Sequence, residues 1–479
     1  MKTAIKKGQE LTVTIEGLAF GGKGFTKIND FIIFIERALP GQKALVRIFK
    51  KKENYAEARL LEVIQPAPHQ KDSQCPHFSI DGCGGCLWQN FEYGQQLVHK
   101  QQQVEECIQH IGGFKDFQVE PIIGSPDVYF YRNKMEYSFN NRPWYPNRED
   151  VPENPPPIAL GLHVPKRFNQ IIDIHDCQLL SLQTNQILKY VKSFALQSDV
   201  PAYNQKFYTG FWRHLVFREA KNSGQLMVNI VTSGDKKYFK TVRQLGEELL
   251  KEFPQITTLL HTVNRKRSDT AVGDEEKILH GTGRIIERLG ELEFSISASS
   301  FFQTNSRQAE YLYNKAIEFA DLHGSETVYD LYCGTGTISL YLARAAKHVI
   351  GFELVPEAIK DADLNKQVNQ IENCEFFEGD LKNVLAGKLN EEASSLPLPD
   401  VLITDPPRVG MHALVVAQIL QIRPSKIVYV SCNPSTLARD LKMLCESTYE
   451  LRKVQPVDMF PHTAHCEAVA LLERKQQEK

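Results

Sequence analysis

The chain has 479 residues, of which 42% are hydrophobic and 24% charged, and its formal net charge is −2. This length predicts two to four domains, and the composition is ordinary for a soluble globular protein. No apolar run is long enough to span a membrane, and no apolar core follows the N-terminal lysines, so we expect a cytoplasmic protein rather than a membrane or secreted one.

Residues 1–65 are predicted to form a small barrel. A glycine-rich turn covers 17–24, and apolar strands are expected at 11–15, 31–35, 44–49 and 56–63. Short strands at regular spacing favour a five-stranded barrel that resembles an OB fold. Lysines on the later strands and on the glycine turn suit oligonucleotide binding, but a solvated charged rim would explain them equally well.

Residues 66–295 are predicted to form a mixed central domain. It begins at a proline-containing linker, 66–68, and a helix is expected from about 91 to 111, where two glycines end it. Strands of mixed pattern follow, with a proline-rich loop at 143–157. The periodicity of this region leaves its topology open.

Three cysteines crowd together near the start of the central domain. Cys75, Cys83 and Cys86 have the spacing C-x7-C-x2-C, and Cys177 is a plausible distant fourth ligand. In a cytoplasmic chain such a cluster indicates metal binding rather than disulfides. The spacing fits a structural zinc site and an iron–sulfur cluster about equally, and a reduced, metal-free loop is the third alternative.

Residues 296–479 show a different pattern, in which apolar strands alternate with helices. This alternation predicts an α/β fold with a mostly parallel, doubly wound sheet of the Rossmann type. Ligands bind such sheets at the carboxyl ends of the strands. Since Glu353, Asp405 and Cys432 all follow predicted strands, one cleft is expected to contain them.

A glycine loop, Gly334-Thr335-Gly336, follows the first of these strands. It lacks the third glycine of a dinucleotide motif and the lysine of a phosphate-binding loop. With Glu353 placed to bind ribose hydroxyls, and Asp380 placed to approach the adenine edge, the pattern favours S-adenosylmethionine as the cofactor. An ordinary tight turn is the alternative interpretation of the glycines alone.

Cys432 lies between a strand and a predicted helix, in the run Ser-Cys-Asn-Pro. The start of the helix is expected to stabilise its thiolate and lower its pKa, which predicts a nucleophile rather than an inert core cysteine. Glu467, at the edge of the last apolar segment, is the candidate general base. The alternative is that Glu467 is an ordinary surface charge, which its position alone does not exclude.

Taken together, these motifs resemble the RNA uridine-5-methyltransferase family, and in particular its bacterial 23S ribosomal RNA branch, over nearly the whole chain. The resemblance implies that the barrel is a TRAM domain and that the four cysteines bind a [4Fe-4S] cluster. It implies a nucleophile at Cys432 and a base at Glu467. The cofactor contacts that it implies are Gln303, Tyr332, Glu353 and Asp405, whereas Asp380 stands where some relatives have asparagine.

We therefore expect an enzyme that methylates carbon 5 of a uridine in 23S rRNA through a covalent bond between Cys432 and carbon 6. Segment 131–134 is expected to face RNA, with Arg132 and Lys134 on phosphates, and Phe301 and Phe302 are candidates to stack on bases. The same chemistry on the T-loop uridine of tRNA is one alternative. A non-catalytic RNA-binding or redox-sensing protein is another. The partner is expected to be RNA, and the chain is expected to be a monomer.

Overall fold

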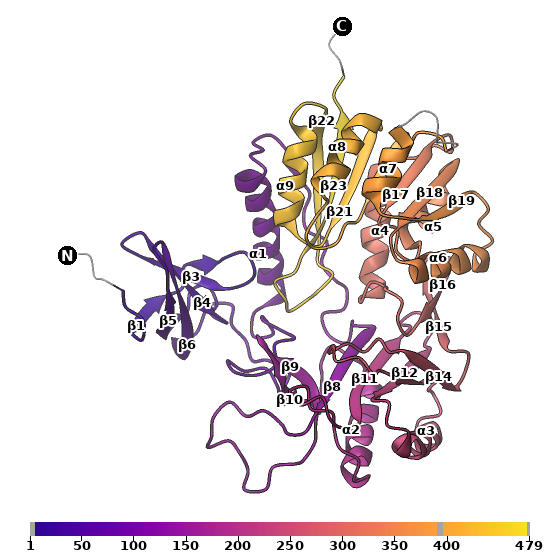
Figure 1. Cartoon of the computed structure of the whole chain (residues 1–479). Coiled ribbons are helices and arrows are strands. Elements are labelled where there is room, and N and C mark those ends of the chain that lie inside the picture. The colour runs from indigo at the N-terminus through magenta and orange to yellow at the C-terminus, as the bar shows by residue number, and fades with distance from the viewer. Residues whose placement is uncertain (1–4, 390–395, 477–479) are drawn as a thin grey trace.

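The computed structural model describes residues 5–389 and 396–476, and its three large sheets follow one another along the chain (Figure 1). The N-terminal sheet has the strand order β1-β5-β6-β4-β3-β2. Its strands are β1 (Glu10–Thr14), β2 (Gly17–Leu18), β3 (Gly24–Ile28), β4 (Phe31–Glu36), β5 (Lys43–Lys51) and β6 (Tyr55–Gln65).

Strands β1 and β2 are two halves of one bent strand, because β1 pairs with β5 at one edge of the sheet and β2 with β3 at the other. When β1 and β2 are counted as one strand, the sheet has five strands and forms the expected barrel. Alternate side chains point inward, and Ile33, Ile35, Ala44, Val46 and Ala58 are fully buried in its core.

The central sheet has the order β10-β9-β8-β11-β12-β13-β14, a topology that the sequence pattern left open. Its strands are β8 (Lys134–Asn140), β9 (Ala159–Val164), β10 (Arg167–Asp173), β11 (Trp212–Glu219), β12 (Leu226–Thr232), β13 (Thr258–Val263) and β14 (Glu275–His280). Helices α2 (Leu182–Gln197) and α3 (Phe239–Glu252) pack on it, and η2 (Lys236–Tyr238) precedes α3.

The C-terminal sheet has eight strands in the order β19-β18-β17-β20-β21-β23-β22-β7. They are β7 (Gln118–Val119), β17 (Thr327–Leu331), β18 (His348–Glu353), β19 (Cys374–Glu378), β20 (Val401–Thr404), β21 (Lys426–Ser431), β22 (Tyr449–Val457) and β23 (Glu467–Arg474). Strands β17 to β21 are parallel, and β23 is inserted antiparallel between β21 and β22.

Helices cover both faces of this sheet, as the doubly wound pattern predicted. Side chains that alternate along a strand enter opposite cores, so Val328 packs on one face and Tyr329 on the other. One face is covered by α4 (Ser306–Ala320) and α5 (Thr337–Ala343), and the other by α7 (Leu381–Leu389), α8 (Ala413–Ile422) and α9 (Pro434–Cys445); α6 (Pro356–Val368) follows β18.

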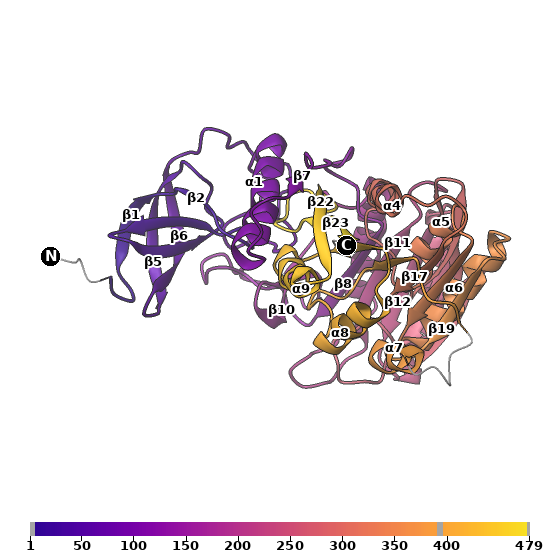
Figure 2. The ribbon, with the colours of Figure 1, turned by 90° about the horizontal axis from the view of Figure 1, so that it is seen from above.

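Two segments before residue 296 pack with the C-terminal sheet. Helix α1 (Tyr93–Glu106) and the following η1 (Cys107–Ile111) lie beside α9, and β7 pairs with β22 at the sheet edge (Figures 1 and 2). The hairpin of β15 (Arg284–Leu289) and β16 (Leu292–Ser297) packs into the core of the same region. The division at residues 65 and 295 stays a prediction, since the chain crosses back and forth between these parts.

None of the helices in the described ranges combines the length and the apolar character that crossing a membrane would require.

Candidate functional site

A cleft with a volume of about 1560 Å³ lies at the carboxyl ends of the parallel strands. This space exceeds what one small molecule needs, so it can hold a nucleoside cofactor together with a nucleotide of RNA. Six of the predicted catalytic and cofactor-binding residues line it: Gln303, Tyr332, Glu353, Asp405, Cys432 and Glu467.

The glycine loop adopts a backbone that few residues tolerate. Gly334 has a φ of 55° and Gly336 a φ of 77°, and a Cβ on Gly336 would lie 2.7 Å from the ring of Phe376. Gly334 donates its N–H to one oxygen of Glu353 at 3.1 Å, and the other oxygen accepts the N–H groups of Leu354 and Val355. These bonds fix the Glu353 carboxylate at the floor of the cleft.

Asp380 lies outside this arrangement. It is not among the residues that line the cleft. Its carboxylate accepts the N–H of Lys382 at 3.1 Å at the start of α7 and pairs with the ammonium of the same lysine, also at 3.1 Å. These contacts lower the pKa of Asp380. The role of Asp380 in binding adenine therefore stays a prediction that its present contacts do not favour.

Cys432 and Glu467 are neighbours because β21 and β23 are antiparallel partners. The register pairs Ser431, the last residue of β21, with Ala468 of β23, and the residues next to this pair, Cys432 and Glu467, both line the cleft. Cys432 is partly exposed, whereas Glu467 is only 2% exposed. Asn433 caps the following helix by accepting the N–H of Ser435.

The pKa of Cys432 is raised to about 11, and the expectation of a lowered pKa is wrong for this structure. Burial is the largest cause, and the charges of Glu467 and Asp405 add to it. Burial also raises the pKa of Asp405 to about 7 and that of Glu467 well above its ordinary value.

Arg408 is a cation near Cys432 and Glu467 that the sequence motifs did not indicate. It lines the cleft, and its charge favours both the thiolate of Cys432 and the carboxylate of Glu467. Its guanidinium lies 3.3 Å from Nδ1 of His465, which also lines the cleft. The sequence signal that could have indicated Arg408 is its position directly after Asp405-Pro406-Pro407.

The loop from Asp458 to Cys466, which leads into Glu467, is fastened to α1. A fully buried ion pair joins Lys100 of α1 to Asp458 at 2.5 Å. Asp458 also accepts from the hydroxyl of Tyr93 at 2.9 Å, and Lys100 donates to the carbonyl of Phe460 at 2.9 Å.

A second connection joins this loop to the chain after the cysteines. The carbonyl of His462 accepts the N–H groups of Leu87 and Trp88, and its own N–H donates to Gln96. We call the side chains of Tyr93, Gln96, Lys100 and Asp458 the loop clamp. Because these pairings join residues some 360 positions apart in the chain, periodicity could not reveal them.

Of the residues expected to contact RNA, some line the cleft and others do not. Arg132 lines the cleft, whereas Lys134 pairs with Glu136 at 2.6 Å and does not line it. Phe301 is 69% exposed and lines the cleft, but Phe302 is 4% exposed and belongs to the core. Of the two phenylalanines, Phe301 alone is available to stack on a base.

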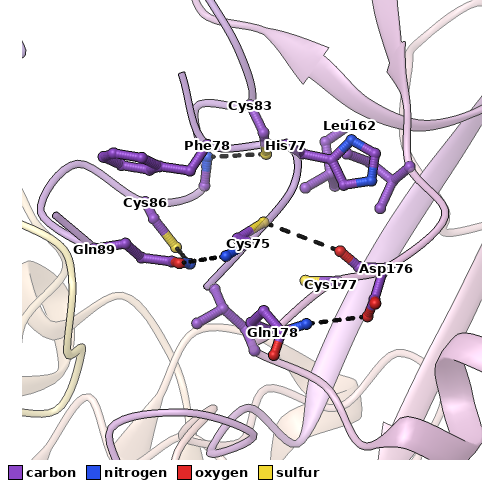
Figure 3. A pocket seen from close by; sticks show the side chains of 13 residues that line it. Cys75, His77, Phe78, Cys83, Cys86, Gln89, Leu162, Asp176, Cys177 and Gln178 are labelled. Carbon is purple, nitrogen blue, oxygen red and sulfur yellow. Dashed lines mark hydrogen bonds between the residues drawn. The ribbon is translucent and has the colours of Figure 1, made fainter. Parts of the chain in front are cut away.

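The four cysteines of the predicted cluster line one small pocket (Figure 3). Cys75, Cys83 and Cys86 come from the loop before α1, and Cys177 comes from the segment between β10 and α2. Donors reach two of the sulfurs: the N–H of Gly85 lies 3.4 Å from Cys83, and the amide of Gln89 lies 3.2 Å from Cys86. The other walls include the apolar side chains of Phe78, Leu162, Ile174 and Leu179.

The described residues contain no group of three or more histidine, cysteine or acidic side chains arranged to hold a single metal ion. Burial raises the pKa of Cys83 to about 11 and that of Cys86 to about 12. Without a bound cation, these two thiols are therefore expected to stay protonated at neutral pH.

Comparisons with known proteins agree with the fold and the cleft. A family model described as tRNA (Uracil-5-)-methyltransferase matches residues 223–475, and one described as TRAM domain matches residues 5–61. An RNA methyltransferase of Chlorobaculum tepidum is 40% identical over 477 residues, which are 98% of each chain. One of Bacteroides thetaiotaomicron is 41% identical over 95% of this chain and all of its own.

Among solved structures, the tRNA (uracil-54, C5)-methyltransferase of Pyrococcus abyssi in complex with S-adenosyl-L-homocysteine superposes with a TM-score of 0.75. It is 28% identical, and the match covers 96% of this chain and all of that one. The fold and its relatives thus define the class, an RNA methyltransferase with a TRAM domain. More narrowly, the chain belongs to the tRNA (uracil-5-)-methyltransferase family. The predicted resemblance and fold class are confirmed.

Proposed function

We propose that this protein transfers a methyl group from S-adenosylmethionine to carbon 5 of a uridine in 23S rRNA, through a covalent bond between Cys432 and carbon 6 of the base. The observation that carries this proposal is that Cys432 and Glu467, each one residue beyond the paired Ser431 and Ala468, line the same large cleft. A non-catalytic RNA-binding protein would not need a buried carboxyl beside a partly exposed cysteine at that position.

The residues around the glycine loop fit S-adenosylmethionine. The loop carries no lysine for a phosphate, and Glu353 presents a fixed carboxylate that can accept ribose hydroxyls. Gln303, Tyr332 and Asp405 line the same cleft and complete the proposed contacts. When bound, this cofactor supplies an electrophilic methyl group on a positively charged sulfur.

The chain's own residues supply the remaining chemistry. The sulfur of Cys432 adds to carbon 6, which moves electron density to carbon 5 and makes that atom nucleophilic. After carbon 5 has gained its methyl group, Glu467 removes the proton that remains there. The bond between carbon 6 and sulfur then breaks, which restores the double bond of the base and the Cys432 thiolate. Arg408 favours the charged forms of both side chains.

Two substitutions test this assignment. Cys432→Ala is expected to abolish 5-methyluridine formation and to leave S-adenosylhomocysteine binding, measured by calorimetry, within about twofold. Glu467→Gln is expected to accumulate a covalent RNA–protein adduct that shifts the protein band on a denaturing gel. An active Cys432→Ala variant, or normal turnover without adduct in Glu467→Gln, would contradict the proposal.

The choice of 23S rRNA rests on the combination of a TRAM barrel with four clustered cysteines, which resembles the ribosomal branch. The second candidate is the T-loop uridine of tRNA, which is favoured by the superposition on the Pyrococcus abyssi tRNA enzyme. Mapping of 5-methyluridine in 23S rRNA and tRNA, from cells with and without the gene, separates the two candidates. Loss of the modification from tRNA alone would replace the first with the second. The monomeric state and the cytoplasmic location stay predictions.

We further propose that Cys75, Cys83, Cys86 and Cys177 hold a [4Fe-4S] cluster. The chemistry of the pocket supports it. Four cysteine side chains line the pocket, N–H donors reach the sulfurs of Cys83 and Cys86, and apolar side chains form other parts of its wall. A cluster there would supply a rigid cross-link between the loop before α1 and the central sheet. Anaerobic purification is expected to give a brown protein with about four irons per chain. Stoichiometric zinc, or no metal, would overturn the assignment.

A further inference from the structure

Two surface loops of the central sheet place aromatic and basic side chains next to one another. The loop before β11 carries Phe207, which is 65% exposed, and Tyr208, which is 49% exposed. The loop from β13 to β14 carries Arg267, whose guanidinium lies 5.1 Å from the ring centre of Tyr208. The ammonium of Lys206 lies 5.4 Å from the ring centre of Phe207. We call these four side chains the aromatic platform.

The first loop is built to keep its rings exposed. The side-chain oxygen of Asn204 accepts the N–H groups of Lys206 and Phe207, and its backbone N–H donates to the carbonyl of Thr209 at 2.7 Å. Gly210 closes the turn with a φ of 111°, and a Cβ there would lie 2.1 Å from the carbonyl oxygen of Ala202. These contacts hold the turn that presents the two exposed rings.

The buried side chain of Arg213 holds the second loop in place through hydrogen bonds to its backbone. Arg213 is 1% exposed and donates to the carbonyls of Asn264 at 2.9 Å, Lys266 at 2.6 Å and Ser268 at 2.7 Å. A hydrogen bond between Gln205 and Asp269 ties this loop to the first one. A surface that is already ordered loses little conformational entropy when a partner binds.

The charges of the platform favour an anionic partner. In the neighbouring part of the second loop, Arg265 pairs with Glu275 at 3.1 Å and Lys266 with Asp274 at 3.7 Å. Within residues 5–389 and 396–476, by contrast, no carboxylate forms an ion pair with Lys206 or Arg267, whose recorded contacts are with the two rings. An apolar protein surface would leave these cations without a counterion, whereas a nucleotide offers both a flat base and a phosphate.

One loop connects the platform to the cleft. The loop that carries Arg267 also carries Val272 and Gly273, and both of these line the cleft that contains Cys432. A Cβ on Gly273 would lie 2.5 Å from the carbonyl oxygen of Val263, so the loop passes close against β13 at this point. A strand whose uridine enters the cleft can therefore follow this loop to the exposed rings.

From these contacts we infer that the aromatic platform binds unpaired nucleotides that flank the methylated uridine, with Phe207 and Tyr208 stacking on bases and with Lys206 and Arg267 on phosphates. Single-stranded RNA is recognised in this way because its bases are free to stack on aromatic rings. This inference extends the proposed function and rests on it for the identity of the central nucleotide.

The test measures binding of the full chain to a fluorescent oligouridylate and to a fluorescent RNA duplex by anisotropy. The double substitution Phe207→Ala/Tyr208→Ala is expected to weaken oligouridylate binding by about tenfold or more and to leave duplex binding unchanged. Arg267→Gln is expected to reduce the slope of log K against log salt by about 1. Ultraviolet cross-linking should place uridine adducts on the peptide that contains Phe207.

Tyr311→Ala is the matched control, because Tyr311 is 49% exposed on α4, away from the lining of the cleft. Unchanged oligouridylate affinity in the double variant would overturn the inference, and so would an equal loss for duplex RNA, since stacking requires free bases. Neither binding measurement depends on catalysis, so an active Cys432→Ala variant would refute the proposed mechanism without affecting this result.

Discussion

Cys432 lies among groups that oppose its ionisation. Burial and the charges of Glu467 and Asp405 raise the pKa of its thiol to about 11, and Arg408 opposes this shift only in part. Next to Cys432, the two carboxyl groups outweigh the one arginine, so a positively charged ligand suits this part of the cleft better than a free thiolate does. We therefore expect the nucleophile to be largely protonated in the free protein at neutral pH and to ionise as charged ligands enter.

Alkylation of Cys432 tests this expectation. The rate constant for reaction with iodoacetamide, followed on the Cys432 peptide by mass spectrometry, should rise about tenfold per pH unit from pH 7 toward pH 10. Glu467→Gln should move the profile to lower pH, because it removes a negative neighbour, and Arg408→Gln should move it to higher pH. A plateau below pH 8 in the unsubstituted protein would contradict the assigned electrostatics.

Asp405 provides a second test at this scale. Burial raises its pKa from 3.8 to about 7, so the folded protein holds this proton more tightly than the unfolded chain does between about pH 4 and pH 7. The free energy of unfolding should therefore fall as the pH rises through this window, by at most about 4 kcal/mol from this group. Asp405→Asn should remove that part of the fall in denaturant-unfolding midpoints, whereas parallel pH profiles for the two proteins would refute the shift.

At the scale of elements, the loop clamp determines where the candidate base lies. Lys100 and Asp458 are both fully buried, and an ion pair at that depth contributes little net stability because both charges lose their water. What the pair supplies is one position for the loop from Asp458 to Cys466, and hence for the start of β23. Helix α1 thus acts on the cleft without lining it.

Breaking one side of this pair should be costly. Lys100→Met is expected to lower the free energy of unfolding by about 3–5 kcal/mol, since Asp458 remains buried without its cation. The double variant Lys100→Met/Asp458→Leu should recover most of that stability but little of the methylation rate, measured as kcat at saturating RNA. Arg344→Gln, at an exposed pair with Glu291, is the control and should change stability by less than about 1 kcal/mol. Full recovery of kcat in the double variant would contradict a positioning role.

At the scale of the whole molecule, the cysteine pocket and the cleft are joined through one short segment. Gly84 and Gly85 line the cleft, Gly85 also lines the cysteine pocket, and the next residues, Leu87 and Trp88, donate to the carbonyl of His462 in the clamped loop. A group bound by the cysteines would therefore stabilise the wall of the cleft as well as the central sheet.

Removal of the proposed cluster should show this connection. After oxidative loss of iron, amide hydrogen exchange of residues 458–466 is expected to accelerate by about tenfold or more, because the bonds from Leu87 and Trp88 hold that loop. Exchange of β17, which lies in the centre of the sheet, should stay unchanged and serves as the internal control. Unchanged exchange in 458–466 would show that the two sites are independent.

Local patterns were sufficient for much of the C-terminal sheet. The glycine loop, the strands that end at Glu353 or directly before Asp405 and Cys432, and the alternation of helices and strands all depend on neighbouring residues, so periodicity predicts them. The central sheet could not be predicted, because its strands β11 to β13 are buried on both faces and show no alternation. The role of Asp380 stays a prediction, since a place just beyond a strand end does not by itself decide whether a side chain lines the cleft, and Asp380 is not among the lining residues.

Residue type and short-range spacing were enough to predict the α/β class, the barrel and several candidate side chains, and the family resemblance implied the remaining site residues. The closeness of Cys432 and Glu467 depends on the tertiary structure, because it requires β23 to pair beside β21. The direction of the Cys432 pKa shift depends on it as well, because burial and the charges of Glu467 and Asp405 outweigh the opposing charge of Arg408. The same holds for the loop clamp, whose partners meet only when α1 packs against the C-terminal sheet.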